Sequence, residues 1–407
     1  MFSDKDDIIL AKGVNVNRKA DKNVNVLVYG SEKDGKYESY IFPNIQNLLG
    51  NYIIIDTNDK IFNLTNEYMT KNGYNVVKYD ISDYNPFDYV SLDIDVSLLS
   101  NSIIKNSSVH IHNYHDEKSL DTFFKIIIYY ALSINNEKIS LIHCEMILND
   151  LKDGNLSLQK VLDSIDKKIV VDDYKNTLDK LSIDEINDII CDLTKILKDL
   201  EDNNISQSTD ISLKGTLTNI NLYEVCMQKS ILYLKPSQKS YLNSMFFTQL
   251  IEQLFLIAEK HYGRLPYYTL LILDNFENLG FIYNYDIMIS TSRSRGISHS
   301  LIIDDWFKFK NLYNEKWNII MGNIGSGVFL RNLNSTSKNV LQISDGNFFN
   351  ITNTELPPNK CIVYKKEKPL EIKEKYHKKN KFEKYSRLQN HTIKELSSDN
   401  MESKNST

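Results

Sequence analysis

The sequence predicts an α/β fold with a largely parallel sheet, interrupted by an inserted all-α domain. Apolar strand patterns alternate with helical patterns over residues 24–81 and again over residues 206–364, as in strand–helix–strand crossovers. Between these blocks, residues 117–205 carry apolar residues three or four apart, which is the period of amphipathic helices. The two α/β blocks are therefore expected to build one sheet.

The first block is expected to alternate three strands with two helices. Its strands are short apolar runs, and its second helix ends where Asn72-Gly73 breaks the pattern. The expected strands are Val24–Tyr29, Tyr52–Asp56 and Tyr74–Ile81, and the expected helices are Glu38–Leu49 and Asp59–Lys71.

The rest of the chain is expected to continue with a helical segment and a second α/β block. Helices are predicted over Asp121–Leu132 and Ile183–Leu200, followed by a polar linker over Glu201–Asp210. The second block contains five apolar runs typical of buried strands and two helical patterns, the first closed by Gly263. These strands are Ser230–Leu234, Thr269–Asp274, Ile297–Ile303, Val328–Leu330 and Cys361–Tyr364, and the helices are Ser240–His261 and Tyr285–Ser294.

We therefore expect four regions along the chain. Residues 1–116 and 206–364 form the two parts of the α/β domain, residues 117–205 form the inserted domain, and residues 365–407 form a basic, then polar, disordered tail. Lys365–Arg387 contains ten Lys or Arg against four Glu, whereas the whole chain has a net charge of −5. Aromatic residues in this segment suit either stacking on single-stranded nucleic acid or packing on the sheet domain.

Composition excludes several classes of protein. Over 407 residues, 42% are hydrophobic and 25% charged, as in soluble globular domains. The four cysteines form no C-x-x-C motif, which argues against zinc and against a disulfide framework. No run approaches the roughly 18 apolar residues of a membrane helix, and the acidic N-terminus lacks the apolar region of a signal peptide.

The loop Gly30–Tyr37 matches the G-x-x-x-x-G-K pattern of phosphate-binding loops. Its spacing lets backbone amides surround phosphates, and Lys36 would reach the terminal ones. The next position normally carries the Ser or Thr hydroxyl that holds Mg²⁺, but here it carries Tyr37. Gly30, Gly35, Lys36 and Tyr37 are thus the expected nucleotide-binding residues.

A second element of a nucleotide site is the strand that ends in Asp274. An acid at this position orders Mg²⁺ and its waters in P-loop proteins, so Asp274 is the expected metal ligand. Hydrolytic enzymes usually place a Glu next as general base, whereas this chain has Asn275. An amide cannot take a proton from water, and general-base catalysis contributes about 10²–10⁴-fold.

Several motifs in collinear order resemble the TraG/TraD-type coupling proteins of type IV secretion systems. The resemblance covers roughly residues 8–385, and the combination of motifs is more specific than any one of them. The motifs are Asn25–Asn47 with Phe42-Pro43-Asn44, Tyr52–Asp56, Tyr84-Asn85-Pro86-Phe87, Leu273–Gly280, Ser292–Ile297, Ser300–Ile303 and Leu356–Ile362.

The resemblance implies a RecA-like P-loop motor domain with an all-α insertion and with ATP and Mg²⁺ as cofactors. Proteins of this family form hexamers at the inner face of the membrane and pass a relaxase–DNA complex to the secretion channel. By position, Lys36 would be the phosphate lysine, Asp274 the Mg²⁺-ordering acid and Arg293 an arginine finger that reaches a neighbouring subunit. We accordingly expect a cytoplasmic chain, peripheral to the membrane.

The departures from the family pattern predict a degenerate site. Tyr37 and Asn275 replace the Mg²⁺ hydroxyl and the catalytic Glu, and Asp304 replaces the sensor Gln. Glu32 and Asp34 add carboxylates to the phosphate loop itself. The family's two N-terminal membrane helices are not found in this sequence. We expect weak nucleotide binding, inefficient hydrolysis and a role in binding or assembly.

Two alternatives remain open at this stage. The chain could be an active DNA-translocating ATPase in which Glu277 or Asp304 replaces the lost base. It could instead be a soluble adaptor that recruits relaxase and DNA to a separate motor. Apart from this choice, the expected partners are single-stranded DNA and further subunits of a homo-hexamer or mixed hexamer. A metal site at His110, His112, His115 and Asp116 is a further hypothesis, which the resemblance disfavours because the family has no metal there.

Overall fold

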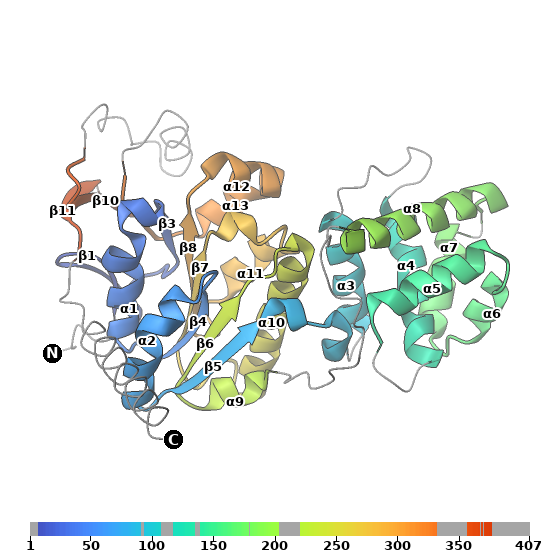
Figure 1. Ribbon diagram of the computed structural model, residues 1–407, viewed down its shortest axis with the longest axis horizontal. Coiled ribbons are helices and arrows are strands. Elements are labelled where there is room, and N and C mark those ends of the chain that lie inside the picture. The colour runs from blue at the N-terminus through green and yellow to red at the C-terminus, as the bar shows by residue number, and fades with distance from the viewer. Residues whose placement is uncertain are drawn as a thin grey trace, which may run out of the picture.

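The protein is described by a computed structural model that covers residues 7–90, 93–106, 117–134, 139–178, 180–202, 220–331, 356–366, 368 and 370–376. The predicted α/β class is confirmed: a nine-stranded, mostly parallel sheet carries helices on both faces, and a group of helices lies beside it (Figure 1). The strands are β1 Asp7–Ala11, β2 Val14–Asn17, β3 Val26–Tyr29, β4 Asn51–Ile55, β5 Asn75–Asp80, β6 Ser230–Lys235, β7 Thr269–Asp274, β8 Ile297–Ile303, β9 Ser326–Phe329, β10 Lys360–Lys365 and β11 Glu371–Glu374. The helices are α1 Phe42–Gln46, α2 Lys60–Lys71, α3 Asp93–Asn106, α4 Glu117–Ile134, α5 Leu141–Lys152, α6 Leu158–Asp163, α7 Lys168–Leu178, α8 Ile183–Asp202, α9 Leu222–Met227, α10 Ser240–Lys260, α11 Tyr285–Thr291, α12 Trp306–Tyr313 and α13 Trp317–Gly322.

The sheet interleaves strands from the two sequence blocks. Its order is β11-β10-β9-β3-β8-β7-β4-β6-β5, and within the described residues only the β9–β10 and β10–β11 pairs are antiparallel. The phosphate-loop strand β3 therefore lies between β8 and β9, and β4 lies between β7 and β6. Neither block can form this sheet without the other.

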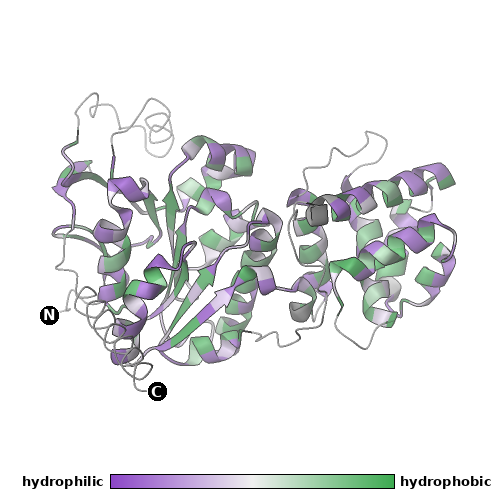
Figure 2. Ribbon diagram, in the orientation of Figure 1, coloured by the Kyte–Doolittle hydropathy of each residue, from purple (hydrophilic) through white to green (hydrophobic). Residues whose placement is uncertain are grey.

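The central strands are buried on both faces, as parallel strands covered by crossover helices must be. Every residue of β3, β4, β7 and β8 is buried, and in Figure 2 these strands are largely green. Val26 and Val28 pack on one side in the core that contains residues of α1 and α2, whereas Leu27 and Tyr29 face the core formed with α10 to α13. This alternation follows from the two-residue period of a strand.

The helical group contains α4 to α8, and α3 connects it to the sheet domain. α3 packs against both α10 and α4, and α4 supplies fully buried side chains such as Phe123, Phe124 and Ile127. These helices include the predicted Asp121–Leu132 and Ile183–Leu200. The division of the chain at residues 116 and 205 stays a prediction.

The expected disordered tail begins with ordered structure. Residues 371–374 form β11, which pairs with β10, and the side chain of Lys375 is buried. The described part of the basic segment thus packs on the sheet domain, and residues 377–407 lie outside the described residues. Among the helices that are described, none combines the length and the hydropathy needed to cross a bilayer.

His299 is an ionisable residue at the centre of the sheet. It lies on β8 with no exposed surface, and its ring nitrogens meet the Tyr285 hydroxyl at 2.9 Å and the Ser292 hydroxyl at 2.8 Å. Burial lowers the pKa of His299 to about 3, because the charged imidazolium would lose its hydration.

Protein stability should fall on acidification because of His299. The unfolded chain binds a proton at a pKa of about 6.5 whereas the folded chain resists it until about 3, so the unfolding free energy should decrease by about 1.4 kcal/mol per pH unit within that window. Urea unfolding of wild type and His299→Gln between pH 7 and 4 measures this slope, which the variant should lose. Equal slopes in the two proteins would assign the acid sensitivity to other groups.

Candidate nucleotide-binding site

The loop Gly30–Tyr37 leaves the carboxyl end of β3, in the middle of the sheet. The Gly30 amide donates to the carbonyl of Ile303 at the end of β8, at 3.1 Å. Gly30 has a φ of +152°, and a Cβ there would lie 2.9 Å from the Cβ of Leu330. Gly35 has a φ of +83°. Both glycines of the predicted motif thus have conformations that favour glycine.

Both carboxylates within the loop have partners in the protein. The backbone amide and the hydroxyl of Ser31 each donate to Asp34 Oδ2 at 2.7 Å, so Asp34 closes the loop on itself. Glu32 accepts from Lys60 at 2.6 Å. The negative charge that these residues add to the loop is therefore offset locally.

Lys36 lies buried and is bound by the acid of the second motif. Its Nζ is 2.7 Å from Asp274 Oδ1 and 3.1 Å from Asn275 Oδ1, and the side chains of Lys36 and Asp274 are 4% and 6% exposed. Burial raises the pKa of Asp274, and the neighbouring ammonium of Lys36 opposes that rise. The structure thus brings together the phosphate lysine and the acid predicted from sequence, as an ion pair.

Tyr37 occupies the position of the missing hydroxyl and is itself buried. The Nζ of Lys60 lies 4.2 Å from the centre of the Tyr37 ring, within the range of a cation–π contact. Burial raises the pKa of Tyr37, as do the negative charges of Asp274 and Glu32. The phenol therefore keeps its proton at neutral pH and is a poor ligand for Mg²⁺.

The residues present fit a nucleotide–Mg²⁺ complex only in part. The loop backbone, Lys36 and Asp274 lie together at the carboxyl ends of β3 and β7, but the carboxylate of Asp274 already binds Lys36. Across the part of the chain that is described, no group of three or more His, Cys, Asp or Glu side chains is arranged to hold a metal ion. The histidine cluster at residues 110–116 lies outside that part.

Asp304, at the sensor position, is also engaged. Its carboxylate lies 2.9 Å from Arg331, which is 3.7 Å from Asp34 as well. Glu277 holds the same loop, because its Oε1 accepts from the backbone amides of Asp304 and Asp305, each at 3.0 Å. Glu277 Oε2 is buried and has no hydrogen-bond partner among the described residues.

Arg331 and Lys375 contribute to this site although sequence reasoning did not select them. Arg331 follows β9, which pairs with β3, so its guanidinium reaches the loop and lies 4.5 Å from the ring of Tyr29. Lys375 follows β11 and donates to the carbonyl of Asp34 at 2.8 Å. The only sequence signal was the excess of Lys and Arg around Lys375.

Arg293 lies at the opposite end of the strands from the phosphate loop, before the amino-terminal end of β8. It precedes β8, whereas the phosphate loop and Asp274 follow the carboxyl ends of β3 and β7. Its Nη2 donates to the carbonyl of Asp21 at 3.0 Å. The predicted site residues therefore divide into a loop group and a separate arginine that cannot complete the same site within one chain.

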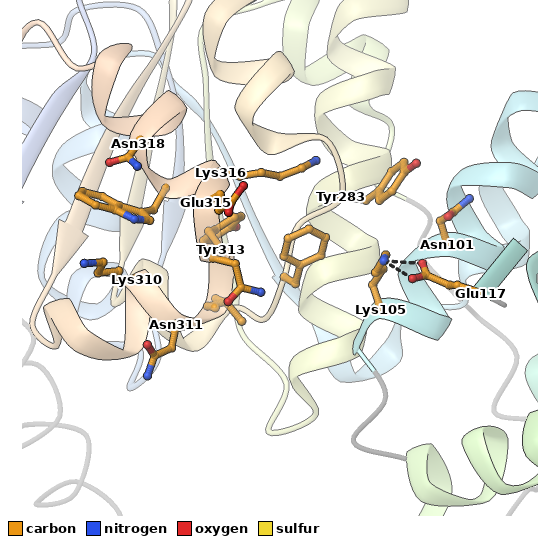
Figure 3. Close-up of a pocket in the computed structure, with 14 residues that line it drawn as sticks. Asn101, Lys105, Glu117, Tyr283, Lys310, Asn311, Tyr313, Glu315, Lys316 and Asn318 are labelled. Atoms are coloured by element: carbon orange, nitrogen blue, oxygen red, sulfur yellow. Dashed lines mark hydrogen bonds and ion pairs between the residues drawn. The ribbon is translucent and has the colours of Figure 1, made fainter. Parts of the chain in front are cut away.

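Two cavities help to locate the site. One of about 470 Å³ borders the phosphate loop and is lined in part by Gly35, Ser39, Arg331 and Lys375. A larger one of about 1200 Å³ lies between the α12–α13 region and α3–α4, with Lys310 on one side and the Lys105–Glu117 ion pair on the other (Figure 3). No residue of the phosphate loop lines the larger cavity, so size alone does not identify the nucleotide site.

Comparisons with known proteins identify a matching family. A sequence profile of the family described as type IV secretory system conjugative DNA transfer matches residues 2–342. No curated protein matches the chain.

Solved structures with the same fold share little sequence with this chain. The bacterial conjugative coupling protein TrwBdeltaN70, in its unbound monoclinic form, is 12% identical with a TM-score of 0.57, over 92% of this chain and 89% of that one. TrwB in complex with ADP and Mg²⁺ is 12% identical with a TM-score of 0.59, over 91% and 89%. VirB4 of Thermoanaerobacter pseudethanolicus is 10% identical with a TM-score of 0.53, over 93% and 99%.

The Lys36–Asp274 pair should dominate the stability of the site. Lys36→Met leaves the aspartate buried without its cation, so the unfolding free energy measured in urea should fall by about 3–5 kcal/mol. Adding Asp274→Leu removes the unpaired charge and should restore most of that loss.

The control for this prediction is Lys60→Met, which removes a more exposed pair with Glu32. It should cost less than about 1 kcal/mol. A Lys36→Met variant no less stable than Lys60→Met would contradict the prediction.

Proposed function

The chain belongs to the type IV secretory system conjugative DNA transfer family, and from this premise we propose that it is a coupling-protein-like component with a degenerate ATP site. In this proposal the chain binds nucleotide weakly and serves binding or assembly rather than efficient hydrolysis. The observation that carries it is the buried contact between Lys36 and Asp274.

Nucleotide binding has to compete with that contact. The lysine that would meet the phosphates and the acid that would order Mg²⁺ neutralise each other at 2.7 Å. A triphosphate must draw Lys36 away from Asp274, and the lost interaction subtracts from the binding free energy. Tyr37 has no aliphatic hydroxyl that could replace the carboxylate of Asp274 as a partner for Mg²⁺.

Hydrolysis would be hindered further by the groups around the phosphate position. The Asn275 side chain cannot act as a base, and its oxygen already accepts from Lys36. Asp304 is paired with Arg331. The three replaced residues, Tyr37, Asn275 and Asp304, would act at the same phosphate group. The effects of these replacements on the rate of hydrolysis therefore need not multiply.

An active ATPase is the second candidate, and one observation favours Glu277 as its base. Glu277 is buried, burial raises the pKa of its carboxyl, and its Oε2 has no partner among the described residues. A carboxyl with those properties near a phosphate loop suits proton abstraction. Asp304 is the weaker choice because Arg331 holds it.

The family premise also supplies the proposed partners and location. We place the chain with the type IV secretion and conjugation machinery at the cytoplasmic face of the membrane, where a relaxase–DNA complex would be the substrate. Arg293 lies at the opposite edge of the sheet from its own loop, so in a hexamer it would act on the nucleotide of a neighbouring copy. If the chain is instead an adaptor that recruits relaxase to a separate motor, it has the same partners but hydrolyses no ATP.

The nucleotide site is tested by restoring the missing hydroxyl. Calorimetric titration of ATP with Mg²⁺ should show weak binding to wild type and binding at least about tenfold tighter to Tyr37→Thr, because the new hydroxyl can hold Mg²⁺. Tyr37→Phe is the matched control, since it changes the side chain without adding an aliphatic hydroxyl, and it should bind like wild type.

Turnover separates the two candidates. With ATP, Mg²⁺ and single-stranded DNA, the phosphate released by wild type should not exceed that of Lys36→Ala. Hydrolysis by wild type that disappears in both Lys36→Ala and Glu277→Gln would overturn the degenerate-site proposal and assign Glu277 as the base. Co-purification with a relaxase without any ATP dependence would support the adaptor role.

A further inference from the structure

The cavity beside the phosphate loop contains a buried cation, Lys375, which follows β11. The residue is 6% exposed, and its ammonium donates to the carbonyl of Asp34 at 2.8 Å but forms no ion pair with a carboxylate of the described residues. Burial lowers the pKa of Lys375 because the ammonium loses hydration, and the charge of Asp34 opposes that fall without cancelling it. A buried ammonium with so few partners favours an anionic ligand.

A buried hydroxyl in the same cavity also lacks a partner. Ser39 lies on the helical turn Tyr37–Ile41 and is 2% exposed, and its Oγ has no hydrogen-bond partner among the described residues. Gly35 lies beside it, since a Cβ there would be 3.5 Å from Ser39 Oγ. A buried hydroxyl without a hydrogen bond costs free energy, which a ligand oxygen can recover. The hydroxyl is therefore a second donor for a ligand next to the phosphate loop.

The other charges of the cavity are engaged or exposed. Three basic and two acidic side chains line it: Lys33, Arg331, Lys375, Asp34 and Glu38. The two exposed side chains among them, one from each group, have opposite charges. The carboxylate of Asp34 is held by hydrogen bonds within the loop, and Arg331 is paired with Asp304. Among these lining residues, Lys375 is thus the buried cation that an anion can meet without breaking an ion pair.

We propose that Lys375 and Ser39 bind a phosphoryl group in this cavity, as a contact additional to Lys36. An ammonium and a hydroxyl both donate hydrogen bonds to phosphate oxygens, and the charged donor gives the stronger bond. The cavity volume of about 470 Å³ falls within the range of small-molecule sites.

This inference rests on the proposed function, because it names the residues through which phosphate would bind while Lys36 stays paired with Asp274. It explains how a chain with a neutralised phosphate lysine could still bind nucleotide weakly. A phosphate of a nucleotide and a free inorganic polyphosphate offer the same chemistry to Lys375 and Ser39.

The test measures the affinity of the full chain for fluorescent ATP, with unlabelled ATP and inorganic tripolyphosphate as competitors. Lys375→Met should weaken binding at least about tenfold, because a charge-assisted hydrogen bond is lost. Ser39→Ala should weaken it at least about fivefold, yet its unfolding in urea without ligand should show no loss of stability, since the hydroxyl has no bond to lose in the free protein.

Lys373→Met is the matched control. It removes the same charge from β11, but its side chain is 38% exposed and is paired with Glu371 at 2.6 Å. The affinity for fluorescent ATP should therefore stay unchanged. If Lys375→Met does not fold, Ser39→Ala alone decides the outcome.

The outcomes separate the two ligand sources and decide the inference. Displacement by tripolyphosphate as well as by ATP shows that free polyphosphate suffices, whereas displacement by ATP alone shows that the phosphate binds as part of a nucleotide. Wild-type affinity in folded Lys375→Met or in Ser39→Ala, or an equal loss in Lys373→Met, would overturn the inference. Absence of saturable binding to wild type would overturn it too, although the degenerate-site proposal survives that result. ATP hydrolysis by wild type would contradict the degenerate-site proposal alone.

Discussion

The buried ion pair between Lys36 and Asp274 is the interaction on which the site depends. It joins residues 238 positions apart, one from each sequence block, and links the loop after β3 to the end of β7. Around it, Glu32 meets Lys60, Asp34 meets Ser31, and Asp304 meets Arg331. Glu32, Asp34 and Lys36 of the loop thus have partners within the protein, so a ligand that binds them would have to replace existing contacts.

Much of the fold could be predicted because the parallel strands are buried on both faces. Thr269–Asp274 and Ile297–Ile303 coincide with β7 and β8, since an uninterrupted apolar run has few other stable placements. The β1–β2 hairpin and the antiparallel β11 were not predicted. β2 and β11 are short and are only partly buried or exposed, so neither carries a strong apolar pattern.

The residues of the candidate site could be selected from the sequence, but their contacts could not. The glycines, Lys36 and Asp274 follow from motif spacing, and the structure brings them together at one edge of the sheet. Spacing could not reveal that Lys36 would bind Asp274 directly, because that depends on β3 and β7 both flanking β8. Arg331 and Lys375 were missed for a similar reason: they reach the loop through strands far away in the sequence.

The interleaved sheet also constrains how the chain can be made. β3 leaves the ribosome early, but its two neighbours, β8 and β9, end at Ile303 and Phe329. Until those residues have been synthesised, the first block exposes a strand edge that nothing covers, while the local contacts of α4 to α8 can already form. The helical insertion lengthens this interval, so both neighbours of β3 are missing for most of the time that the chain is being translated.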